Sequence, residues 1–327
     1  MSSSVLAEQA PAVGGPADPP LAARAVGLRK VFGSTVAVDD VDLDVPAGAV
    51  LGMLGPNGSG KTTLIRMLLG LTRPTAGTAE LLGHPIPGDT ARALPHVGAL
   101  VEGPGFHPFL SGRENLLRVA ATEPLVAGRE IPGAVAAALE RVGLSAAADR
   151  RFRGYSLGMK QRLGLAGALL LPRRLVVLDE PTNGLDPAGT RDVRRIIAEL
   201  HAAGSTVIVS SHLLAEVEAT CTHVAVLQSG SLVATGELAA LLASGTGGLD
   251  VVTADVDLAL TVLRDAGVPA HRAPGDEPGV VVADGGPPPA ETIALLVRAG
   301  VAVHEARRRR ARLEELFARL TERSLPE

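Results

Sequence analysis

Apolar and polar residues alternate in short segments over the first part of the chain, and this spacing of two predicts β-strands. Between about residues 103 and 171 the apolar residues recur at helical spacing, which predicts a helical insertion. Apolar strands then alternate with helices as far as residue 244. Because this regular alternation is typical of doubly wound parallel sheets, we expect an α/β domain over residues 21–244.

The elements expected in this domain follow from the same spacing. The strands are Ala25–Arg29, Val36–Val45, Val50–Leu54, Thr78–Leu82, Arg174–Leu178, Thr206–Ser210 and His223–Leu227. The helices begin with the apolar run Leu64–Leu69 and continue over residues 111–121, 131–142, 156–170, 187–203 and 213–220. Ser111 and Glu114 have the spacing of a capping box, and the first strands are expected to form an antiparallel flap over Val50–Leu54.

A second, smaller α+β domain is expected after the glycine-rich stretch Gly245–Gly248. Its expected elements are a strand over 249–254, a helix over 258–266, strands over 270–273 and 280–282, a helix over 290–298 and a strand over 301–305. This order is the ferredoxin-like pattern, and it assigns residues 249–306 to that fold.

Both ends of the chain differ in composition from the two domains. Residues 1–20 are rich in Ala, Pro, Ser and Gly and are expected to form a disordered tail. Residues 307–327 are expected to form a closing helix and tail, because Leu313, Leu316, Phe317 and Leu320 have helical spacing. Arg307–Arg310 fits either a solvated cationic face or a contact with acidic lipid or a partner.

Composition excludes several kinds of protein. A formal charge of −4, with no Trp, one Tyr and five Phe, offers neither a general attraction to nucleic acid nor a platform for stacking bases. The single cysteine, Cys221, excludes an intramolecular disulfide and is expected to be a small buried hydrophobe in a reducing cytosol. No apolar run reaches the roughly 18 residues of a membrane span. We therefore expect a soluble, intracellular protein that needs a partner for any membrane role.

The clearest chemical signal is the stretch Gly55-Pro56-Asn57-Gly58-Ser59-Gly60-Lys61-Thr62-Thr63, between an apolar strand and an apolar helix. In that context a glycine loop turns its backbone N–H groups into one concavity, and the helix N-terminus adds partial positive charge. Lys61 is expected to reach the β- and γ-phosphates of a nucleotide, and the Thr62 hydroxyl to bind Mg²⁺. The alternative is a chance glycine turn.

Two carboxylates follow a later apolar strand. Asp179 and Glu180 end the run that begins at Leu175, and ligands of parallel sheets bind at the carboxyl ends of the strands. Asp179 is expected to hold Mg²⁺, directly or through water, and Glu180 to polarise the water that attacks the γ-phosphate. A pair of helix-capping carboxylates is the alternative.

Four sequence motifs together carry a family resemblance. Tyr155-Ser156-Leu157-Gly158-Met159-Lys160-Gln161-Arg162 resembles the signature motif of ATP-binding-cassette (ABC) ATPases, and Asn183-Gly184-Leu185-Asp186 resembles their D-loop. His212 matches their switch histidine; a histidine taken alone is more often structural, but its placement after the strand Thr206–Ser210 favours the switch role. With the phosphate loop and Asp179, these motifs occur in the order of that family, and the resemblance covers about residues 21–244.

The resemblance implies a P-loop NTPase cassette with a parallel sheet core, an antiparallel β flap and a helical subdomain. It also implies a head-to-tail dimer with two ATP molecules at the interface, each held by one subunit's phosphate loop and the other subunit's Ser156 and Gly158. Asp186 is expected to link the two sites and His212 to contact the γ-phosphate.

Two further residues are assigned by position in the family. Phe32 fits the place that stacks on adenine, with simple packing in the flap as the alternative. Glu102 stands where the family usually has a glutamine that touches Mg²⁺ and faces the membrane partner, so it offers an oxygen ligand with an added charge.

The resemblance extends to the bacitracin- and anthracycline-exporter branch, through Glu102, the Leu157 and Met159 variants of the signature and the C-terminal domain. It implies an ATPase subunit on the inner face of the cell membrane, which drives a separate multi-span permease. The permease would export a drug, antibiotic or other hydrophobic solute.

A mechanical or regulatory ABC ATPase acting on nucleic acid or ribosomes is the second hypothesis. Such relatives carry coiled coils, zinc insertions or two cassettes, which this sequence does not show, and we expect no nucleic-acid partner. A third reading, a nucleotide-binding module without turnover, conflicts with an intact Glu180.

Overall fold

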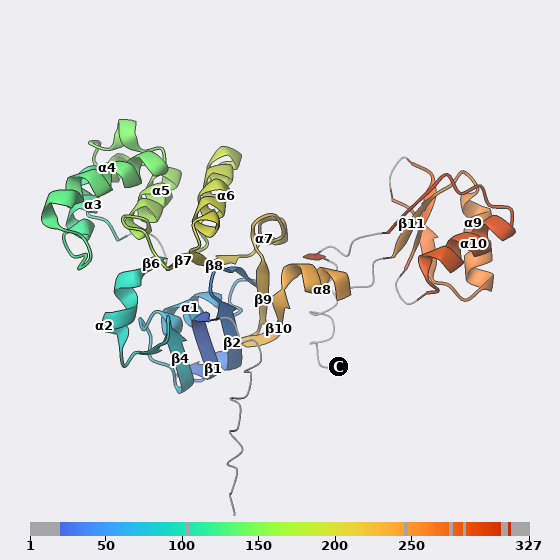
Figure 1. The fold of residues 1–327 in the computed structure, drawn as a ribbon, viewed down its shortest axis with the longest axis horizontal. Coiled ribbons are helices and arrows are strands. Elements are labelled where there is room, and N and C mark those ends of the chain that lie inside the picture. Colours follow the sequence, from blue (N-terminus) through green and yellow to red (C-terminus); the bar gives the residue numbers. More distant parts are fainter. Residues whose placement is uncertain are drawn as a thin grey trace, which may run out of the picture.

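The computed structural model describes residues 20–101, 105–244, 248–274, 277–283, 286–308 and 313–314. Within these ranges the strands form three sheets. Figure 1 shows two of the sheets with their helices in one body, and the third in a smaller unit near the C-terminal end.

The first sheet is an antiparallel flap. It consists of β1 (Leu21–Phe32), β2 (Thr35–Pro46), β4 (Ala76–Leu81) and β5 (His84–Ile86), in the order β2-β1-β4-β5. All neighbouring strands in it run antiparallel, which confirms the flap expected from the alternating pattern. The pattern does not predict β5, because this strand has three residues and contains Pro85.

The second sheet is the core of the larger body. Its order is β10 (Ser231–Glu237), β9 (His223–Gln228), β3 (Val50–Leu54), β8 (Thr206–Ser211), β7 (Leu175–Asp179) and β6 (Val97–Leu100). The strands from β9 to β6 are parallel, as expected, and β10 is an antiparallel edge. The two edge strands, β6 and β10, are additions to the predicted sheet.

Side chains of this sheet alternate between two hydrophobic cores. In β7, Leu175 and Val177 belong to the core that includes the flap and α1 (Lys61–Leu68). Val176 and Leu178 belong to the core that includes α6 (Pro187–Ala202) and α7 (Leu214–Thr220). Because successive side chains of a strand point to opposite faces, the sheet is covered on both sides and its carboxyl edge stays open for a site.

The expected helical insertion is present. It consists of α3 (Gly112–Ala120), α4 (Ile131–Arg141) and α5 (Leu157–Ala168), which pack against one another and lie beyond the sheet in Figure 1. The predicted capping box is confirmed, since Ser111 accepts a hydrogen bond from the Glu114 N–H and the Glu114 carboxylate accepts one from the Ser111 N–H. A short helix, α2 (Thr90–Ala93), leads from the flap into β6.

The smaller unit begins after α8 (Leu238–Ser244) and has a core of its own. Its elements are β11 (Leu249–Val252), α9 (Val256–Asp265), β12 (Ala270–Arg272), β13 (Gly279–Val282), α10 (Pro289–Arg298) and β14 (Glu305–Arg308). They form a four-stranded antiparallel sheet in the order β12-β13-β11-β14.

The last strand corrects the prediction. A strand over 301–305 is wrong, because the ladder with β11 begins at Glu305, opposite Val252, and continues to Arg308, opposite Leu249. Val301 instead packs into the core of this unit. The unit therefore extends past residue 306, and Arg307 and Arg308 belong to a strand.

Several predictions concern residues outside the described ranges. These are the tail except for Pro20, the metal role of Glu102, residues 309–310 of the arginine run and the closing helix except for Leu313 and Glu314. Leu313 is fully buried, in the core that α6 and α7 share with the central sheet. In the described parts of the chain no helix combines the length and the apolarity needed to cross a membrane.

Candidate functional site

The loop between β3 and α1 depends on two glycines. Gly55 and Gly60 have φ values of 157° and 101°, in a region that side chains with a Cβ rarely adopt. A Cβ on Gly55 collides with the carbonyl oxygen of Leu227, and one on Gly60 lies 2.5 Å from the carbonyl oxygen of Ala37. The flap and β9 therefore enclose the loop so closely that only glycine fits at these two positions.

The helix that follows this loop has an open N-terminus. Its N-cap is Gly60, which offers no side chain to the first N–H groups, and its first turn contains no acidic residue. In contrast, Ser111, Ser156 and Asp186 cap α3, α5 and α6 with side-chain hydrogen bonds. The Ser59 hydroxyl is also buried without a hydrogen-bond partner among the described residues. Free donors and the helix dipole together favour an anion at this end of α1.

Lys61 is a buried cation at the same place. It is 5% exposed, and its Nζ donates to the carbonyl oxygens of Gly55 at 2.7 Å and Pro56 at 3.2 Å. Glu180 Oε1 lies 3.8 Å from it. A buried ammonium needs compensating acceptors, and here backbone dipoles of the loop supply most of them. The side chain is thus held inside the concavity in which a phosphate is expected.

The two carboxylates end β7 in different environments. Asp179 is buried, and its Oδ1 accepts a hydrogen bond of 2.5 Å from the hydroxyl of Ser210 on the neighbouring strand. Glu180 adopts a left-handed conformation with φ of 49°, and its N–H donates to the same hydroxyl at 2.9 Å. One serine therefore fixes both residues, with Asp179 beneath the surface and Glu180 turned towards the loop.

Glu180 also contacts the predicted histidine. Its Oε2 lies 2.8 Å from His212 Nδ1, while its Oε1 is the oxygen near Lys61. The Glu180 carbonyl accepts a hydrogen bond from Gln161 of α5 at 3.2 Å, so the helical insertion touches this segment as well. The pairing of a carboxylate with an imidazole brings together two groups that can exchange a proton.

These residues surround a cavity of about 600 Å³, a size suited to a nucleotide-sized ligand. Its lining consists of the loop from Asn57 to Thr63, including Gly58, Ser59, Gly60, Lys61 and Thr62, together with Phe32, Ala37, Glu180, Asn183 and His212. Sequence reasoning placed most of these residues at a site but did not include Ala37 or Asn183. Asn183 follows the predicted carboxylates by three residues, so its proximity in sequence was the available signal.

Phe32 lies at the flap side of this cavity. Its ring is half exposed, and Lys30 Nζ lies 4.8 Å from the ring centroid. If the Phe32 ring served only to pack the flap, it would be buried. Its exposed surface is instead available to a planar ligand.

Six predicted site residues within the described ranges do not line the cavity. The pair Gly55-Pro56 and Asp179 directly precede residues that do, whereas Ser156, Gly158 and Asp186 belong to other elements. Ser156 accepts from the Met159 N–H at 3.2 Å and Asp186 accepts from the Gly189 N–H at 2.7 Å, so each caps a helix. Gly158 lies beside Leu185, and its neighbour Leu157 is 65% exposed. Within one chain, Ser156, Gly158 and Asp186 therefore lie away from the cavity that the phosphate loop lines.

The residues present fit a magnesium nucleotide without forming a metal cage of their own. No group of three or more His, Cys, Asp or Glu side chains that could hold a metal occurs in the described parts of the chain. Magnesium at phosphates needs few protein ligands, because phosphate oxygens and water complete its shell. The Thr62 hydroxyl and the Asp179 carboxylate are oxygen donors of the required kind.

Comparisons with known proteins agree with this geometry. Residues 38–183 match the family model described as ABC transporter. The bacitracin transport ATP-binding protein BcrA of Bacillus licheniformis is 44% identical over 206 residues, which cover 63% of this chain and 66% of that protein. The daunorubicin/doxorubicin resistance ATP-binding protein DrrA of Streptomyces peucetius is 36% identical over 265 residues, which cover 77% of this chain and 80% of that protein.

The fold has solved counterparts. A structure of the ATP-binding subunit of an ABC transporter superposes with a TM-score of 0.62 at 26% identity, covering 68% of this chain and 92% of that one. The residues matched by the family model lie within the larger body that contains the candidate site.

Proposed function

The chain belongs to the ATP-binding proteins of ABC transporters, and on that basis we propose that it hydrolyses Mg²⁺-ATP to drive a separate membrane permease. The observation that carries hydrolysis, as opposed to binding alone, is the position of Glu180. Its two carboxylate oxygens lie between Lys61 and His212, at the wall of a cavity formed by the phosphate loop.

The loop residues have a defined part in this reaction. The N–H groups of the loop and of α1 bind the β- and γ-phosphates, and Lys61 exchanges its carbonyl partners for phosphate oxygens. Thr62 and Asp179 would hold Mg²⁺, which when bound neutralises negative charge on the phosphates. The metal role of Glu102 stays a prediction, because this residue lies outside the described ranges. Phe32 stacks on the adenine with its open face.

Glu180 orients the attacking water and accepts its proton, and His212 contacts the γ-phosphate from the other side of the carboxylate. We expect the Glu180→Gln variant to bind ATP with an affinity within about threefold of wild type, because the phosphate loop is unchanged. Its turnover should fall roughly 100-fold or more, since an amide is no longer a base. The measurements are steady-state phosphate release and equilibrium binding of ATP.

Glu237→Gln, at an exposed carboxylate of β10, is the matched control and should hydrolyse ATP like wild type. Wild-type turnover by Glu180→Gln would remove Glu180 from the catalytic role. Loss of ATP affinity in the same variant would instead place it among the binding residues.

A second copy of the chain completes the site in this proposal. Ser156 and Gly158 lie at the start of α5, a helix N-terminus away from the cavity, and the exposed Leu157 stands between them. A head-to-tail dimer brings this helix start to the γ-phosphate of the partner's ATP, so that the phosphate lies between two helix N-termini. Asp186, at the start of α6, lies near the same surface and links the two sites.

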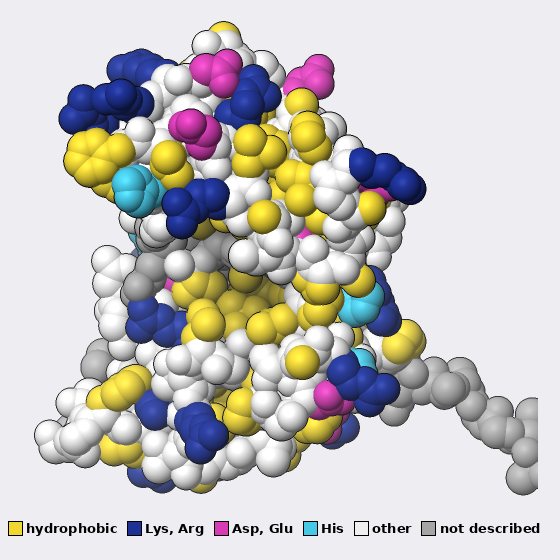
Figure 2. Space-filling model, turned by 90° about the vertical axis from the view of Figure 1, so that its left-hand side faces the viewer, with side chains coloured by type: hydrophobic (Ala, Val, Ile, Leu, Met, Phe, Trp, Pro, Cys, Tyr) yellow, Lys and Arg dark blue, Asp and Glu magenta, His cyan; other side chains and the backbone are white. Residues whose placement is uncertain are grey.

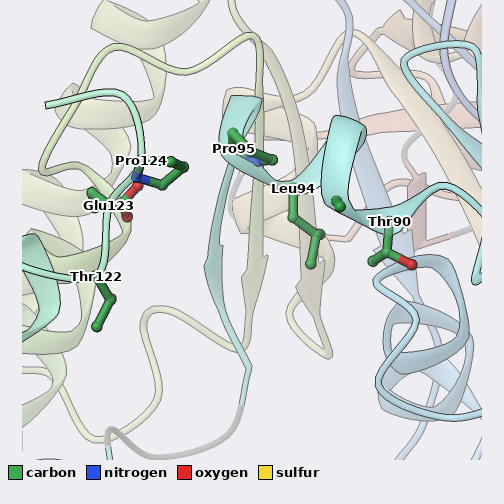
Figure 3. A pocket seen from close by; sticks show the side chains of 7 residues that line it. Thr90, Leu94, Pro95, Thr122, Glu123 and Pro124 are labelled. Carbon is green, nitrogen blue, oxygen red and sulfur yellow. The ribbon is translucent and has the colours of Figure 1, made fainter.

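The permease is expected in a hollow on another face. Figure 2 shows hydrophobic side chains gathered in a waist between the two halves of the larger body. A pocket of about 480 Å³ there is lined by Thr90, Ala91, Leu94, Pro95, Thr122, Glu123 and Pro124. In Figure 3 the residues that follow α3 face those of α2 and the next turn across this pocket. An apolar, concave surface between the sheet and the helical insertion suits a short cytoplasmic segment of a membrane protein.

A buried arginine joins the two walls of this hollow. Arg173 donates to the carbonyl oxygen of Pro95 at 2.6 Å and to Glu123 Oε1 at 2.5 Å. Pro95 precedes β6 and Glu123 follows α3, so one guanidinium holds both sides. A permease segment seated there can transmit movement between the insertion and the sheet.

The permease proposal is tested with Leu94→Glu, which places a charge in the apolar hollow. We expect this variant to lose copurification with a multi-span membrane protein while keeping ATP binding, because the nucleotide cavity lies elsewhere. Leu71→Glu, at an exposed leucine outside the hollow, is the control and should retain the partner. Retention by both variants would contradict the assigned docking surface.

The names of the relatives support export as the direction of transport, and a drug, antibiotic or other hydrophobic solute as the cargo. BcrA is a bacitracin transport protein and DrrA a daunorubicin/doxorubicin resistance protein. Through the permease, the chain is expected on the cytoplasmic face of the membrane. We also assign the smaller unit to the ferredoxin-like fold, which its βαββαβ order and its strand order β12-β13-β11-β14 support.

A further inference from the structure

Two hydroxyl groups, one in the turn after β7 and one on the last residue of β8, donate hydrogen bonds to the same carboxylate oxygen behind the candidate site. The Thr182 hydroxyl donates to Glu216 Oε2 at 2.8 Å, and the Ser211 hydroxyl donates to the same oxygen at 3.0 Å. Thr182 lies two residues after Glu180, and Ser211 directly precedes His212. Glu216, on α7, therefore connects the segment after Glu180 with the loop that carries His212.

Backbone pairing between β7 and β8 ends at the carboxyl edge of the sheet, before these two segments. Asp179 and Ser210 are the last residues paired between β7 and β8. Beyond them the contact between Glu180 and His212 joins two side chains that both reach solvent, with 22% and 45% of their side-chain surface exposed. Such a contact is weak on its own, because water competes for both groups. The Glu216 carboxylate continues the connection between the two segments where the backbone ladder has ended.

The surroundings of Glu216 favour well-defined hydrogen bonds. It lines a small, mainly apolar pocket between α6 and α7, together with Val193, Val217 and Cys221. In such surroundings a hydrogen bond to a carboxylate is strengthened, because little water competes. Ser211 is buried, and its hydroxyl accepts from the Leu213 N–H at 3.0 Å. With its acceptor side engaged in this way, the hydroxyl has its proton available for Glu216.

We propose that Glu216 is a positioning residue for ATP hydrolysis, which sets the separation of Glu180 and His212 without touching the nucleotide. The inference rests on the proposed hydrolytic function. It differs from that function in the residue it concerns, because Glu216 is not among the residues that line the nucleotide cavity. A carboxylate that merely stabilised α7 would lower stability but leave the turnover of the folded enzyme unchanged.

The test compares Glu216→Ala, Glu216→Gln and, as the matched control, Glu218→Ala, which removes an exposed carboxylate two residues further on the same helix. The Ala variant loses both hydrogen bonds, so its kcat should fall roughly 10- to 100-fold while its Kd for ATP stays within about twofold. The Gln variant keeps an oxygen that accepts from Thr182 and Ser211, and should remain within about threefold of wild type. The control should match wild type.

A substitution of the donor residue Thr182 provides a second test. Thr182→Val removes one donor and keeps the shape of the side chain, so it should produce part of the loss seen for Glu216→Ala. Combined with Glu216→Ala it should add little, because both substitutions break the same connection. Independent, additive losses would contradict a shared connection.

A readout without turnover separates this inference from the proposed function. The ring-proton NMR signals of His212, assigned by their absence in His212→Ala, should shift in Glu216→Ala and stay in place in Glu218→Ala, with no nucleotide present. The proposal is overturned if Glu216→Ala hydrolyses ATP like the control, if Gln fails to rescue, or if His212 does not respond. Absence of turnover in the wild type, with the His212 shift observed, would sink the hydrolytic function alone.

Discussion

Glu180 adopts a backbone conformation that is costly for a residue with a side chain. Its φ of 49° lies in the left-handed region, where a non-glycine residue typically costs about 1–3 kcal/mol. Its backbone is held there by two hydrogen bonds, one that its N–H donates to the Ser210 hydroxyl and one that its carbonyl accepts from Gln161. The turn directs its carboxylate between Lys61 and His212, so the strain coincides with the position on which the proposed chemistry depends.

Residue identities at the site could be predicted from the sequence, but their partners could not. Spacing alone indicated Lys61, Asp179 and Glu180, because the loop and strand around them have distinctive patterns. That the Ser210 hydroxyl would bond both the Asp179 carboxylate and the Glu180 N–H depends on β7 and β8 lying side by side in one register, with Asp179 opposite Ser210. Contacts of this kind arise from tertiary pairing, which no local pattern encodes.

Cys221 carries a prediction about reactivity. Burial, with a smaller contribution from the charge of Glu216, raises the pKa of its thiol to about 12. At pH 8 only about one thiol in 10⁴ is then a thiolate, so native protein should not react with a thiol reagent within minutes. One thiol should react once denaturant is added. The free energy of unfolding should be unaffected below the ordinary thiol pKa and decrease as the pH rises from about 9 towards 12. Rapid reaction of the native thiol would contradict this burial.

At the scale of elements, the sequence pattern performed best where a strand is buried on both faces. β7 and β8 are buried along their whole length and were predicted within one residue of their observed ends. Two edge strands, β10 and β14, were missed or misplaced, because no residue of β10 is fully buried and β14 consists of Glu, Ala and two Arg. Such strands form because a neighbour presents free backbone groups, and hydrophobic spacing does not report that.

The connection between β6 and the insertion leads to a stability prediction. Arg173 has 2% of its side-chain surface exposed, and its carboxylate partner is Glu123. Glu123→Ala leaves this guanidinium without a counter-charge, so we expect the free energy of unfolding to fall by about 3 kcal/mol in chemical denaturation. Nucleotide affinity should change little, because both residues lie outside the nucleotide cavity.

Glu130→Ala is the control for that measurement, since Glu130 pairs with Arg129 at the surface. It should cost no more than about 0.5 kcal/mol, as exposed ion pairs usually do. Replacing both members of the buried pair, with Arg173→Met and Glu123→Leu, should recover part of the loss. Equal effects of Glu123→Ala and Glu130→Ala would contradict a special role for the buried pair.

At the scale of the whole molecule, the residues that the structure describes form two cores in the larger body and a third in the smaller unit. The order of these parts could be predicted, because each has its own hydrophobic period and a glycine-rich stretch separates them. That Leu313, after the smaller unit, is buried with the core of the larger body could not. A lone apolar residue at helical spacing does not indicate which surface it contacts.

The separation of the phosphate loop from Ser156 and Gly158 leads to a prediction about assembly. Lys61→Ala damages the loop and Gly158→Asp places a negative charge at the start of α5, so each variant alone should hydrolyse ATP poorly. If every site combines the loop of one subunit with the α5 start of the other, a mixed dimer has one site with both defects and one site with none. Mixing the two inactive variants should therefore restore activity.

The expected size of that recovery follows from the symmetry. In an equal mixture about half of the dimers are mixed, and each has one intact site of two, so turnover should reach about a quarter of the wild-type value. The measurement is phosphate release against the mixing ratio, with a maximum expected at equal amounts. Capture of untagged Lys61→Ala by affinity-tagged wild type serves as the control for subunit exchange. If exchange is observed there but the two inactive variants never recover together, each site is built within one chain, and the head-to-tail arrangement is wrong.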